Sequence, residues 1–519
     1  DSPIVLGQLD LAGDATDVAV DGSQNVAVLA ANAGGVHVVD VSDPMLPSLL
    51  TTWDVSASQV ELFEGVAYLA EGTSIVAVEL ASSDILQELN LGSATITGLA
   101  RHGNFLYTMD ASRNLRVIDV ANTFLQQRGA VQVPHGAGKL FVGETVAYAM
   151  ADSYFRRGFS TIDISNPDSP TVISGSDVVS PFIAPDQFVV PNGSGRGLVI
   201  GTAGAQGVAD LIDLSDPTET NIAEGEFLTR FNLPSQPFSA AIGGGLAFIA
   251  GGTGGLQVVN YLPFDNQGQA PVITATFDDL DIDSQTTGIQ VVEGSTFTVP
   301  VSVMDDVQVR NVELLVNGQV VQNDVSFPFD LLASVPLLAD GSNTATLEVR
   351  ATDTGGNTIS TNPVTVEILP DSTPPSVITI SPGQDSSRFE GHQTIRVRFS
   401  EAMDPQSLTA ANIALTAASN PGIPLVPTDV QVRFGGREVQ LLFPPLALDD
   451  YTITLDASML TDLAGNPIGG ANVTSMFSII ENRDPGDTIA TALDLGVLND
   501  PFFTVDEELG VSGDTADIY

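Results

Sequence analysis

The chain has 519 residues, no cysteine and a formal net charge of −47 at pH 7. Hydrophobic residues make up 43% of it and charged residues 16%, which excludes global disorder and provides enough apolar material for several packed domains. Lys139 is the single lysine, and this shortage of basic residues argues against nucleic-acid binding, which needs clustered Lys and Arg. No apolar run approaches the roughly 18 residues of a membrane span, so we expect no membrane insertion in this segment.

The first half of the chain repeats one pattern, an apolar strand that ends in an acidic or amide residue. In the clearest copies a Ser-x-Pro turn follows. The copies are Val36–Asp40, Ile75–Glu79, Leu115–Asp119, Ser160–Asp163, Asp210–Asp213 and Leu256–Asn260. They recur every roughly 40 to 50 residues, the length of a propeller blade, and each is accompanied by further short strand signals. The pattern predicts a β-propeller of six blades over residues 1–262.

The two ends of the repeat region indicate how the propeller closes. The sixth copy stops after its third strand, at Tyr261, and the chain begins with an extra strand, Ile4–Leu9. We expect this strand to complete the sixth blade, because a closed ring leaves no exposed sheet edge. The repeated Asp is a possible ligand. It is better explained as a brace, since its side chain can accept backbone N–H groups of the turn.

These copies resemble the LVIVD repeat family of bacterial and archaeal surface proteins. The copy that ends at Glu79 departs from the pattern because it lacks the Ser-x-Pro turn. The resemblance implies a secreted, multi-domain protein whose propeller binds or scaffolds other molecules. Within the propeller, Tyr154, Phe155, Arg156 and Arg157 form a basic-aromatic cluster in a long insertion of an otherwise acidic chain. This cluster is a candidate partner contact, with an ordinary loop packed on its own blade as the alternative.

The second half contains two further domains behind Pro-containing linkers. Residues 263–369 alternate apolar and polar residues, as in Thr296–Val303, and predict an immunoglobulin-like sandwich without the Cys pair. The segments Val312–Gly318 and Ala351–Asn357 resemble bacterial Ig-like spacer domains. Residues 370–480 resemble the S-layer-type bacterial Ig-like domain, on the motifs Ile395–Pro405 and Leu460–Pro467.

Residues 481–519 predict a third sandwich that is only partly present. The segments Asp484–Ala492 and Gly510–Tyr519 resemble the start of a prepeptidase C-terminal domain. Because a few strands cannot bury a core, we expect the chain to continue beyond Tyr519 or a neighbouring subunit to complete the fold. The expected fold class is therefore all-β: a six-bladed propeller, two Ig-like sandwiches and a partial third sandwich.

Calcium is the best-motivated ligand, since Ca²⁺ binds six to eight hard oxygens from loop carboxylates and carbonyls. In each Ig-like domain acidic residues follow one long strand and a later one, which would place them at the same end of the sandwich. The candidate calcium ligands are Asp305, Asp306 and Asp353 in the first domain and Glu401, Asp404 and Asp462 in the second. The alternative is that Asp-x-x-Gly-Asn forms a turn without metal.

Other site signals are weak. Asn192 and Asn472 begin N-glycosylation-type sequons, which chance explains well in a chain so rich in Asn, Ser and Thr. The four histidines are scattered, no hydrolase or phosphate-binding motif occurs, and without cysteine there is no thiol nucleophile. The sequence therefore predicts no enzyme within these residues.

These features predict a secreted, cell-surface structural or adhesive protein. The propeller would be the interaction head, and the Ig-like domains would be spacers, with a filament, sheath or S-layer-like assembly as one outcome. The expected partners are other copies of the chain or a cell-surface protein or glycan. The alternatives are the non-catalytic part of an extracellular hydrolase whose catalytic domain lies beyond Tyr519, and a glycan-binding propeller.

Overall fold

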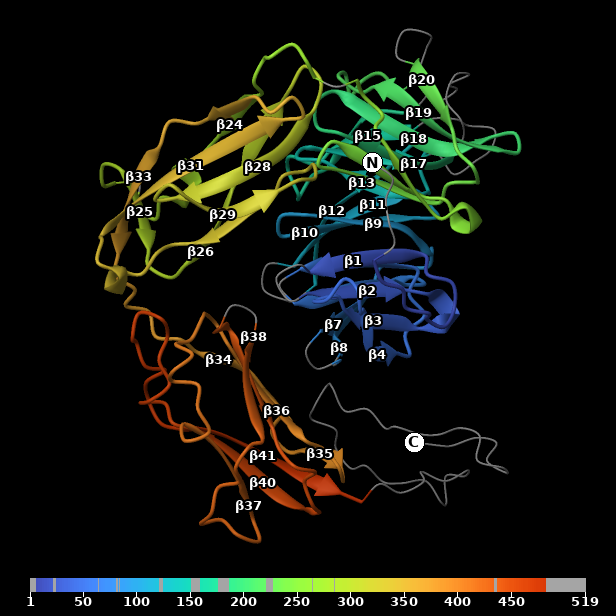
Figure 1. Ribbon diagram of the computed structural model, residues 1–519. Helices are drawn as coiled ribbons and strands as arrows, with labels where there is room; N and C mark the ends of the chain where they lie inside the picture. The colour runs from blue at the N-terminus through green and yellow to red at the C-terminus, as the bar shows by residue number, and fades with distance from the viewer. Residues whose placement is uncertain are drawn as a thin grey trace, which may run out of the picture. The chain divides into compact units, whose positions relative to one another are not determined.

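The computed structural model describes residues 6–481 except 22–24, 64, 81–82, 84, 121–124, 151–158, 176–185, 221–226, 264, 284 and 434–435 (Figure 1). Its regular structure consists of β-strands with a few short 3₁₀ turns, so the predicted all-β class is confirmed. The chain divides into two compact units. The first comprises residues 1–289, 296–333 and 345–366, and the second comprises residues 290–295, 334–344 and 367–519.

Six antiparallel sheets follow one another along the first 259 residues. The first two contain β1 (Asp17–Asp21), β2 (Val26–Ala30), β3 (Val36–Asp40), β4 (Ser48–Trp53), β5 (Gln59–Phe63), β6 (Val66–Glu71), β7 (Ser74–Glu79) and β8 (Ile85–Asn90). The next two contain β9 (Ile96–His102), β10 (Phe105–Asp110), β11 (Asn114–Asp119), β12 (Gln126–Gln132), β13 (Leu140–Val142), β14 (Val146–Met150), β15 (Phe159–Asp163) and β16 (Thr171–Ser174). The last two contain β17 (Asp186–Pro191), β18 (Arg196–Ala203), β19 (Gln206–Asp213), β20 (Phe227–Asn232), β21 (Ser239–Gly243), β22 (Leu246–Ala250) and β23 (Leu256–Val259).

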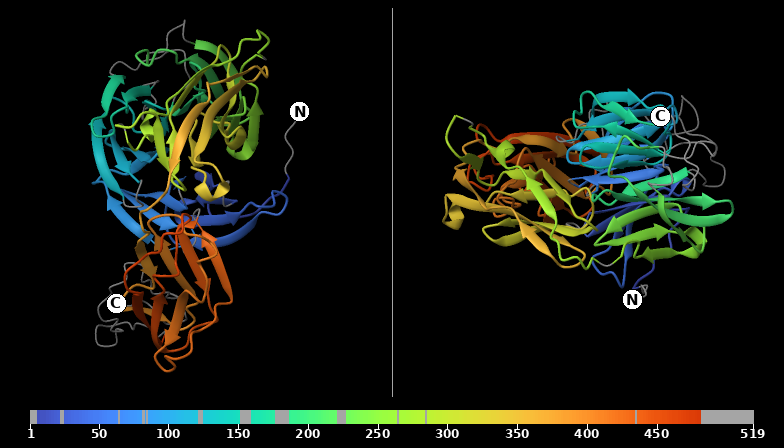
Figure 2. Two further views of the ribbon diagram at one scale, coloured as in Figure 1. Left: turned by 90° about the vertical axis from the view of Figure 1, so that its left-hand side faces the viewer. Right: turned by 90° about the horizontal axis from the view of Figure 1, so that it is seen from above.

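The sheets pack face to face, and their cores lie between neighbouring sheets. Val28 and Val38 of the first sheet share a buried cluster with Leu69 and Val76 of the second. The first strands of the sheets, β1, β5, β9, β13, β17 and β21, contact one another in that order. The sheets therefore succeed one another like propeller blades, from blue to green in Figure 2.

The repeated Asp braces the turn behind the third strand of a blade, as predicted. Asp40 Oδ1 accepts the backbone N–H of Ser42 at 2.8 Å, and Asp213 Oδ1 accepts that of Ser215 at 2.9 Å. Hydrogen bonds from the Ser42 hydroxyl and N–H lower the pKa of Asp40, because they favour the charged carboxylate. The same local hydrogen bond thus recurs after the third strand of these blades.

Each of the first four blades carries a charged side chain on its first strand or directly before it: Asp17 on β1, Glu61 on β5, Arg101 on β9 and Lys139 before β13. Asp17 Oδ2 accepts the N–H of Val60 at 3.0 Å, which joins the first two blades. Burial raises the pKa of Glu61 to about 8. Arg101 lies on β9, and the Nζ of Lys139 lies 5.9 Å from the centre of the Phe188 ring. Burial lowers the pKa of Lys139.

The part of the predicted closing strand Ile4–Leu9 that the structure describes is not a strand. Ile4 and Val5 lie outside the described residues, and residues 6–9 make no strand. In the described chain β23 pairs only with β22, and Leu256 on β23 is 58% exposed. The N-terminal segment nevertheless lies against the first blade, since a Cβ on Gly7 would be 2.6 Å from the carbonyl oxygen of Pro44. Outer strand β12 approaches the next blade in the same way, through Gly129.

The first Ig-like domain follows the linker. It contains β24 (Val272–Ala275), β25 (Ile289–Val292), β26 (Thr296–Val299), β27 (Val301–Met304), β28 (Val309–Val316), β29 (Gln319–Asp324), β30 (Leu331–Ser334), β31 (Thr344–Asp353), β32 (Thr358–Ser360) and β33 (Val364–Leu369). One sheet has the order β25-β33-β31-β28-β29, with β32 beside β31. The predicted single strand Thr296–Val303 is divided at Pro300, which has no N–H for a ladder, so β26 pairs with β30 and β27 with β24.

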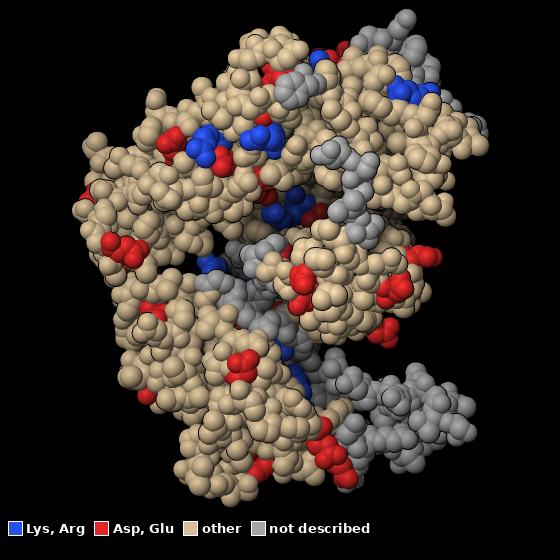
Figure 3. All heavy atoms as spheres, viewed as in Figure 1, with Lys and Arg blue, Asp and Glu red and all other residues tan. Residues whose placement is uncertain are grey.

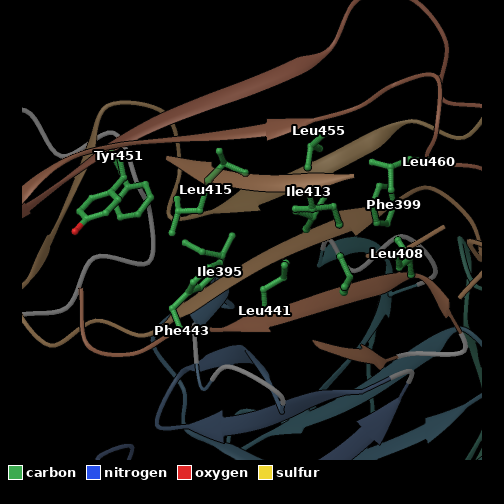
Figure 4. Close-up of a cluster of buried hydrophobic side chains, with 14 of the residues drawn as sticks. Ile395, Phe399, Leu408, Ile413, Leu415, Leu441, Phe443, Tyr451, Leu455 and Leu460 are labelled. Atoms are coloured by element: carbon green, nitrogen blue, oxygen red, sulfur yellow. The ribbon is translucent and has the colours of Figure 1, made fainter. Parts of the chain in front are cut away.

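The second Ig-like domain has two four-stranded sheets, β34-β36-β39-β38 and β35-β41-β40-β37. Its strands are β34 (Val377–Ser381), β35 (Ser386–Phe389), β36 (Thr394–Phe399), β37 (Ile413–Ala417), β38 (Asp429–Arg433), β39 (Glu438–Leu442), β40 (Asp449–Leu455) and β41 (Val473–Ile480). Alternate residues of both sheets meet in one core, where Ile395 and Leu441 lie with Leu415 and Leu455 (Figure 4). The Tyr451 ring stacks on Phe477 with centroids 5.4 Å apart.

The predicted partial third sandwich falls on residues that the structure does not describe, since residues 482–519 lie outside the described part. Among the described residues no helix has the length and apolar character needed to cross a membrane. The visible face in Figure 3 carries scattered Asp and Glu with few Lys or Arg, as the composition requires.

Candidate functional site

Three carboxylates meet at the start of the first Ig-like domain. One oxygen each from Asp265, Asp305 and Asp353 lies within 4.8 Å of the others. Asp265 belongs to the linker behind the propeller, Asp305 follows β27, and Asp353 is the last residue of β31. The fold therefore brings together side chains that are up to 88 positions apart (353 − 265) in the sequence. We call these three residues the first carboxylate cluster.

Backbone and amide N–H groups fix each carboxylate of this cluster. Asp353 accepts the N–H and the Nδ2–H of Asn357, both at 2.8 Å, which is the turn formed by its Asp-x-x-Gly-Asn motif. Asp305 Oδ2 accepts the N–H groups of Val307 at 2.9 Å and Gln308 at 2.7 Å. Asp265 Oδ1 accepts the N–H of Gln267 at 3.0 Å. The side chains are thus held in place by local hydrogen bonds.

The remaining oxygens of two members are buried and unsatisfied. Asp265 is 2% exposed, and its Oδ2 has no hydrogen-bond partner among the described residues. The same holds for Oδ1 of Asp305. Burial raises the pKa of Asp305, and the charges of Asp306 and Asp353 act in the same direction, against the two backbone hydrogen bonds. The cluster is an electronegative, partly dehydrated point in the fold.

The second Ig-like domain contains a similar group. One oxygen each from Asp371, Glu401 and Asp462 lies within 4.8 Å of the others. Asp462 accepts the N–H and Nδ2–H of Asn466 at 2.8 and 2.9 Å, as Asp353 does with Asn357. Burial, a hydrogen bond with Asp371 and the neighbouring negative charges raise the pKa of Glu401 to about 7. We call this group the second carboxylate cluster.

The structure sorts the six calcium candidates into two sets. Four of them lie in the clusters, two in each. Asp306 is exposed and is not a member, and Asp404 instead accepts the N–H of Gln406 at 2.9 Å. Sequence analysis missed the linker residues Asp265 and Asp371. The available signal was their position, because each follows closely on a linker proline at the end of the sandwich where the other candidates were expected.

A second feature is the loop Asp324–Asp330, which joins β29 to β30 and lies on the propeller. Asp324 shapes the loop by accepting the N–H groups of Ser326 at 3.0 Å and Asp330 at 2.8 Å. The Phe327 ring stacks on Phe141, with centroids 6.2 Å apart and planes inclined by 15°. We call Asp324–Asp330 the docking loop.

Polar contacts extend the docking loop across several blades. Asp330 pairs with Arg101 at 3.1 Å and with Nδ1 of His102 at 3.2 Å, both near the β9–β10 turn. The Ser326 hydroxyl donates to the carbonyl of Ile242 at 2.7 Å, beside the β21–β22 turn. These turns join the first and second strands of a blade, and they all lie at one face of a propeller. The docking loop therefore covers this face, which we call the covered face.

The partner candidates Tyr154, Phe155, Arg156 and Arg157 lie outside the described residues. The strand ends that flank them, Met150 and Phe159, are paired at the end of the fourth blade opposite the β13–β14 turn.

The two sequons differ in accessibility. Asn192 is 2% exposed, and its Oδ1 accepts the N–H groups of Ser194 at 2.8 Å and Arg196 at 3.1 Å. This side chain shapes the β17–β18 turn and is inaccessible to a glycosylating enzyme in the folded chain. Asn472 is exposed, and its Oδ1 accepts the N–H of Ala457 at 3.2 Å. Asn472 stays a sequence-based candidate.

The fold defines an all-β, multi-domain protein that joins a β-propeller to immunoglobulin-like sandwiches. Family models agree with the sequence-based resemblances: the LVIVD repeat matches residues 12–55 and 153–177, a bacterial Ig domain matches residues 279–349, and a bacterial Ig-like domain matches residues 371–478. The chain thus contains LVIVD repeats followed by two bacterial Ig-like domains. No family match covers the residues that resemble the prepeptidase domain.

Solved structures with a similar fold include a functionally unknown protein from Desulfotomaculum acetoxidans, with 13% identity, a TM-score of 0.40 and coverage of 50% of this chain and 87% of that one. The Cps50 (Swd1) β-propeller domain of Myceliophteria thermophila has 13% identity, a TM-score of 0.36 and coverage of 47% and 81%. BamB from Moraxella catarrhalis has 11% identity, a TM-score of 0.32 and coverage of 47% of this chain and 85% of that one. These values support no inference about function. No curated protein sequence matches the chain significantly.

Propeller repeats and Ig-like domains are typically non-catalytic, and the matched families include no catalytic one. Bacterial Ig-like domains suggest an extracellular or surface protein, and the architecture of a propeller with such domains fits this class.

Proposed function

We propose that the chain is a secreted cell-surface binding protein, in which the propeller is the interaction head and the Ig-like domains are spacers. The docking loop is the observation that carries the proposal. It seats the first Ig-like domain on the covered face through Phe327, Ser326 and Asp330. A partner of the propeller then has the opposite face available, which we call the free face.

The free face also has the features of a contact surface. Phe238, which directly precedes β21 at the end opposite the β21–β22 turn, is 51% exposed. We assign Phe238 to the partner contact, because an exposed aromatic ring can bury a large apolar area in an interface. The partner class we infer is a cell-surface protein or glycan, or another copy of the chain.

The acidic composition supports the location. A net charge of −47 keeps the protein soluble, and its self-repulsion is weakened at the ionic strength of a salty extracellular medium. Screening of this kind is effective over distances longer than about 8 Å at 0.15 M salt.

The test is sedimentation of the purified chain with cells and with a cell-surface fraction, followed by immunoblotting. Phe238→Glu on the free face should reduce binding at least fivefold. Thr145→Glu, an exposed position in the β13–β14 turn of the covered face, adds the same charge and should leave binding unchanged. Protease or periodate treatment of the cells then identifies a protein or a glycan partner. Equal binding of both variants, or no binding by the unaltered chain, would overturn the proposal.

A further inference from the structure

The first carboxylate cluster contains buried polar groups that the protein itself leaves unsatisfied. Two of its oxygens, Oδ2 of Asp265 and Oδ1 of Asp305, are buried without a hydrogen-bond partner among the described residues. Buried carboxylate oxygens without partners are costly, because the charge has lost its hydration and gains nothing in return. The three carboxylates of the cluster, within 4.8 Å of one another, add mutual repulsion to that cost.

The hydrogen bonds of the cluster leave these two oxygens without a donor. Asp265 uses Oδ1 for the N–H of Gln267, and Asp305 uses Oδ2 for two backbone N–H groups, so the other oxygen of each is available. Asp353 accepts one N–H on each oxygen, and a carboxylate oxygen has a further lone pair. Asp265 and Asp305 are therefore each held through one oxygen and can offer the other to a common ligand, while Asp353 can offer a remaining lone pair.

From this geometry we propose that Asp265, Asp305 and Asp353 bind a Ca²⁺ ion. The donor set consists of carboxylate oxygens alone, which hard cations prefer, and it contains no His or Cys that would favour zinc or copper. Ca²⁺ holds oxygens at about 2.3–2.6 Å, so two of its ligands can lie up to about 5 Å apart, and a span within 4.8 Å is compatible with one ion. Carbonyls and water complete the coordination, as Ca²⁺ accepts six to eight ligands.

The site would join the linker to the domain that follows it. Asp265 comes from the linker, and the other two ligands come from the sandwich. Gly355, in the turn after Asp353, lies so close to this linker that a Cβ would be 2.8 Å from the carbonyl oxygen of Asp265. The N–H of Asp305 donates to the hydroxyl of Ser194 in the propeller at 3.3 Å. Calcium bound here would therefore stiffen the passage from the propeller into the first Ig-like domain, independently of what the free face binds.

The experiment is isothermal titration of the full chain with CaCl₂ after EDTA treatment and dialysis, in parallel with MgCl₂. Asp265→Asn and Asp305→Asn should each remove one bound Ca²⁺ per chain or weaken it at least tenfold. Asp306→Asn is the matched control: it removes the same charge from the neighbouring exposed position and should bind as the unaltered chain does. Mg²⁺ should bind at least tenfold more weakly, because it demands a tighter octahedral geometry.

Thermal unfolding provides a second test that does not depend on the number of Ca²⁺ ions counted by titration. In EDTA the Asp265→Asn variant should unfold at a temperature equal to or above that of the unaltered chain, since it loses repulsion and no partner. In 2 mM CaCl₂, above the roughly 0.1–1 mM dissociation constants of extracellular calcium modules, the unaltered chain should gain several degrees, and the variant should not. Equal calcium binding by Asp265→Asn and Asp306→Asn, or no binding at millimolar Ca²⁺ by the unaltered chain, would overturn the site while leaving the proposed cell-surface binding untouched.

Discussion

Removing the charge of Asp330 should weaken the seat of the first Ig-like domain on the propeller. Its carboxylate lies 3.1 Å from Arg101 and 3.2 Å from His102, and the Asp330 and Arg101 side chains keep exposures of 26% and 21%. Burial alone would raise the pKa of Asp330, but the hydrogen bond from His102 and the charge of Arg101 outweigh it, so that its pKa is lowered. The ion pair therefore stabilises the folded chain at neutral pH, and this contribution is lost as the pH falls below the usual carboxyl range.

The size of the effect follows from the geometry. Two unit charges about 4 Å apart attract by about 4 kcal/mol at an effective dielectric constant of 20, and fully exposed pairs give about 0.2–1 kcal/mol in practice. For this partly exposed pair we expect a coupling free energy of about 1–1.5 kcal/mol. It is measured by a double-mutant cycle of Asp330→Asn and Arg101→Met. The cycle subtracts the separate effect of losing the Arg101 charge that faces Glu61.

The assay is urea unfolding at pH 7 and low salt, followed by the fluorescence of Trp53, the single tryptophan, which is 6% exposed. Urea is needed because guanidinium chloride would screen the pair. The comparison requires equal urea dependence of the unfolding free energy in all four proteins. With 0.5 M NaCl the coupling should fall by half or more. A coupling below about 0.3 kcal/mol at low salt would refute the role given to the ion pair.

Three further predictions concern the propeller and the second sandwich. Glu61 has a pKa of about 8 in the folded chain against an ordinary 4.5, so the free energy of unfolding should fall as the pH rises from 4.5 to 8. The variant Glu61→Gln should show a smaller fall when urea unfolding is measured at pH 5.5, 7 and 8.5. Asp213→Ala should cost about 1–2 kcal/mol in urea unfolding, because the Ser215 N–H and the Arg196 guanidinium lose their acceptor; a loss below 0.5 kcal/mol, the approximate size of an ordinary surface substitution, would contradict the brace. Ile453→Ala, at a fully buried position, should cost about 2–5 kcal/mol in the transition of the second Ig-like domain, resolved by calorimetry, while the propeller transition keeps its temperature.

The blades could be predicted from the sequence because each is a local structure. A strand that ends in Asp and the turn that donates N–H groups to this Asp are adjacent in the chain. Val36–Asp40 and its copies can therefore be recognised from short stretches of sequence. Closure of the ring is different, since it requires two segments about 250 residues apart in the chain to pair. Residues 6–9 approach the turn at Pro44, as β12 approaches the turn of the blade that follows it, yet they form no strand with β23.

The carboxylate clusters show the same limit at the level of side chains. Asp305 and Asp353 could be paired from the expected strand order of a sandwich. Asp306 could not be rejected without knowing which way the backbone turns after β27, because neighbouring residues of an extended chain point to opposite sides. Asp265 was missed because a linker carries no periodic signal, and its contribution depends on how the linker returns over the Asp353 turn.

The single lysine gives the protein an unusual chemical property. Side-chain amines are the usual targets of acylating labels and of lysine-specific proteases, and this chain offers one, Lys139, which is partly buried over the Phe188 ring. Its lowered pKa increases the fraction of neutral, reactive amine, while its burial limits access by the reagent. The rate at which Lys139 is acylated therefore measures how often the structure opens around the first strands of the blades. No other side chain in the sequence carries an amine that would contribute to this signal.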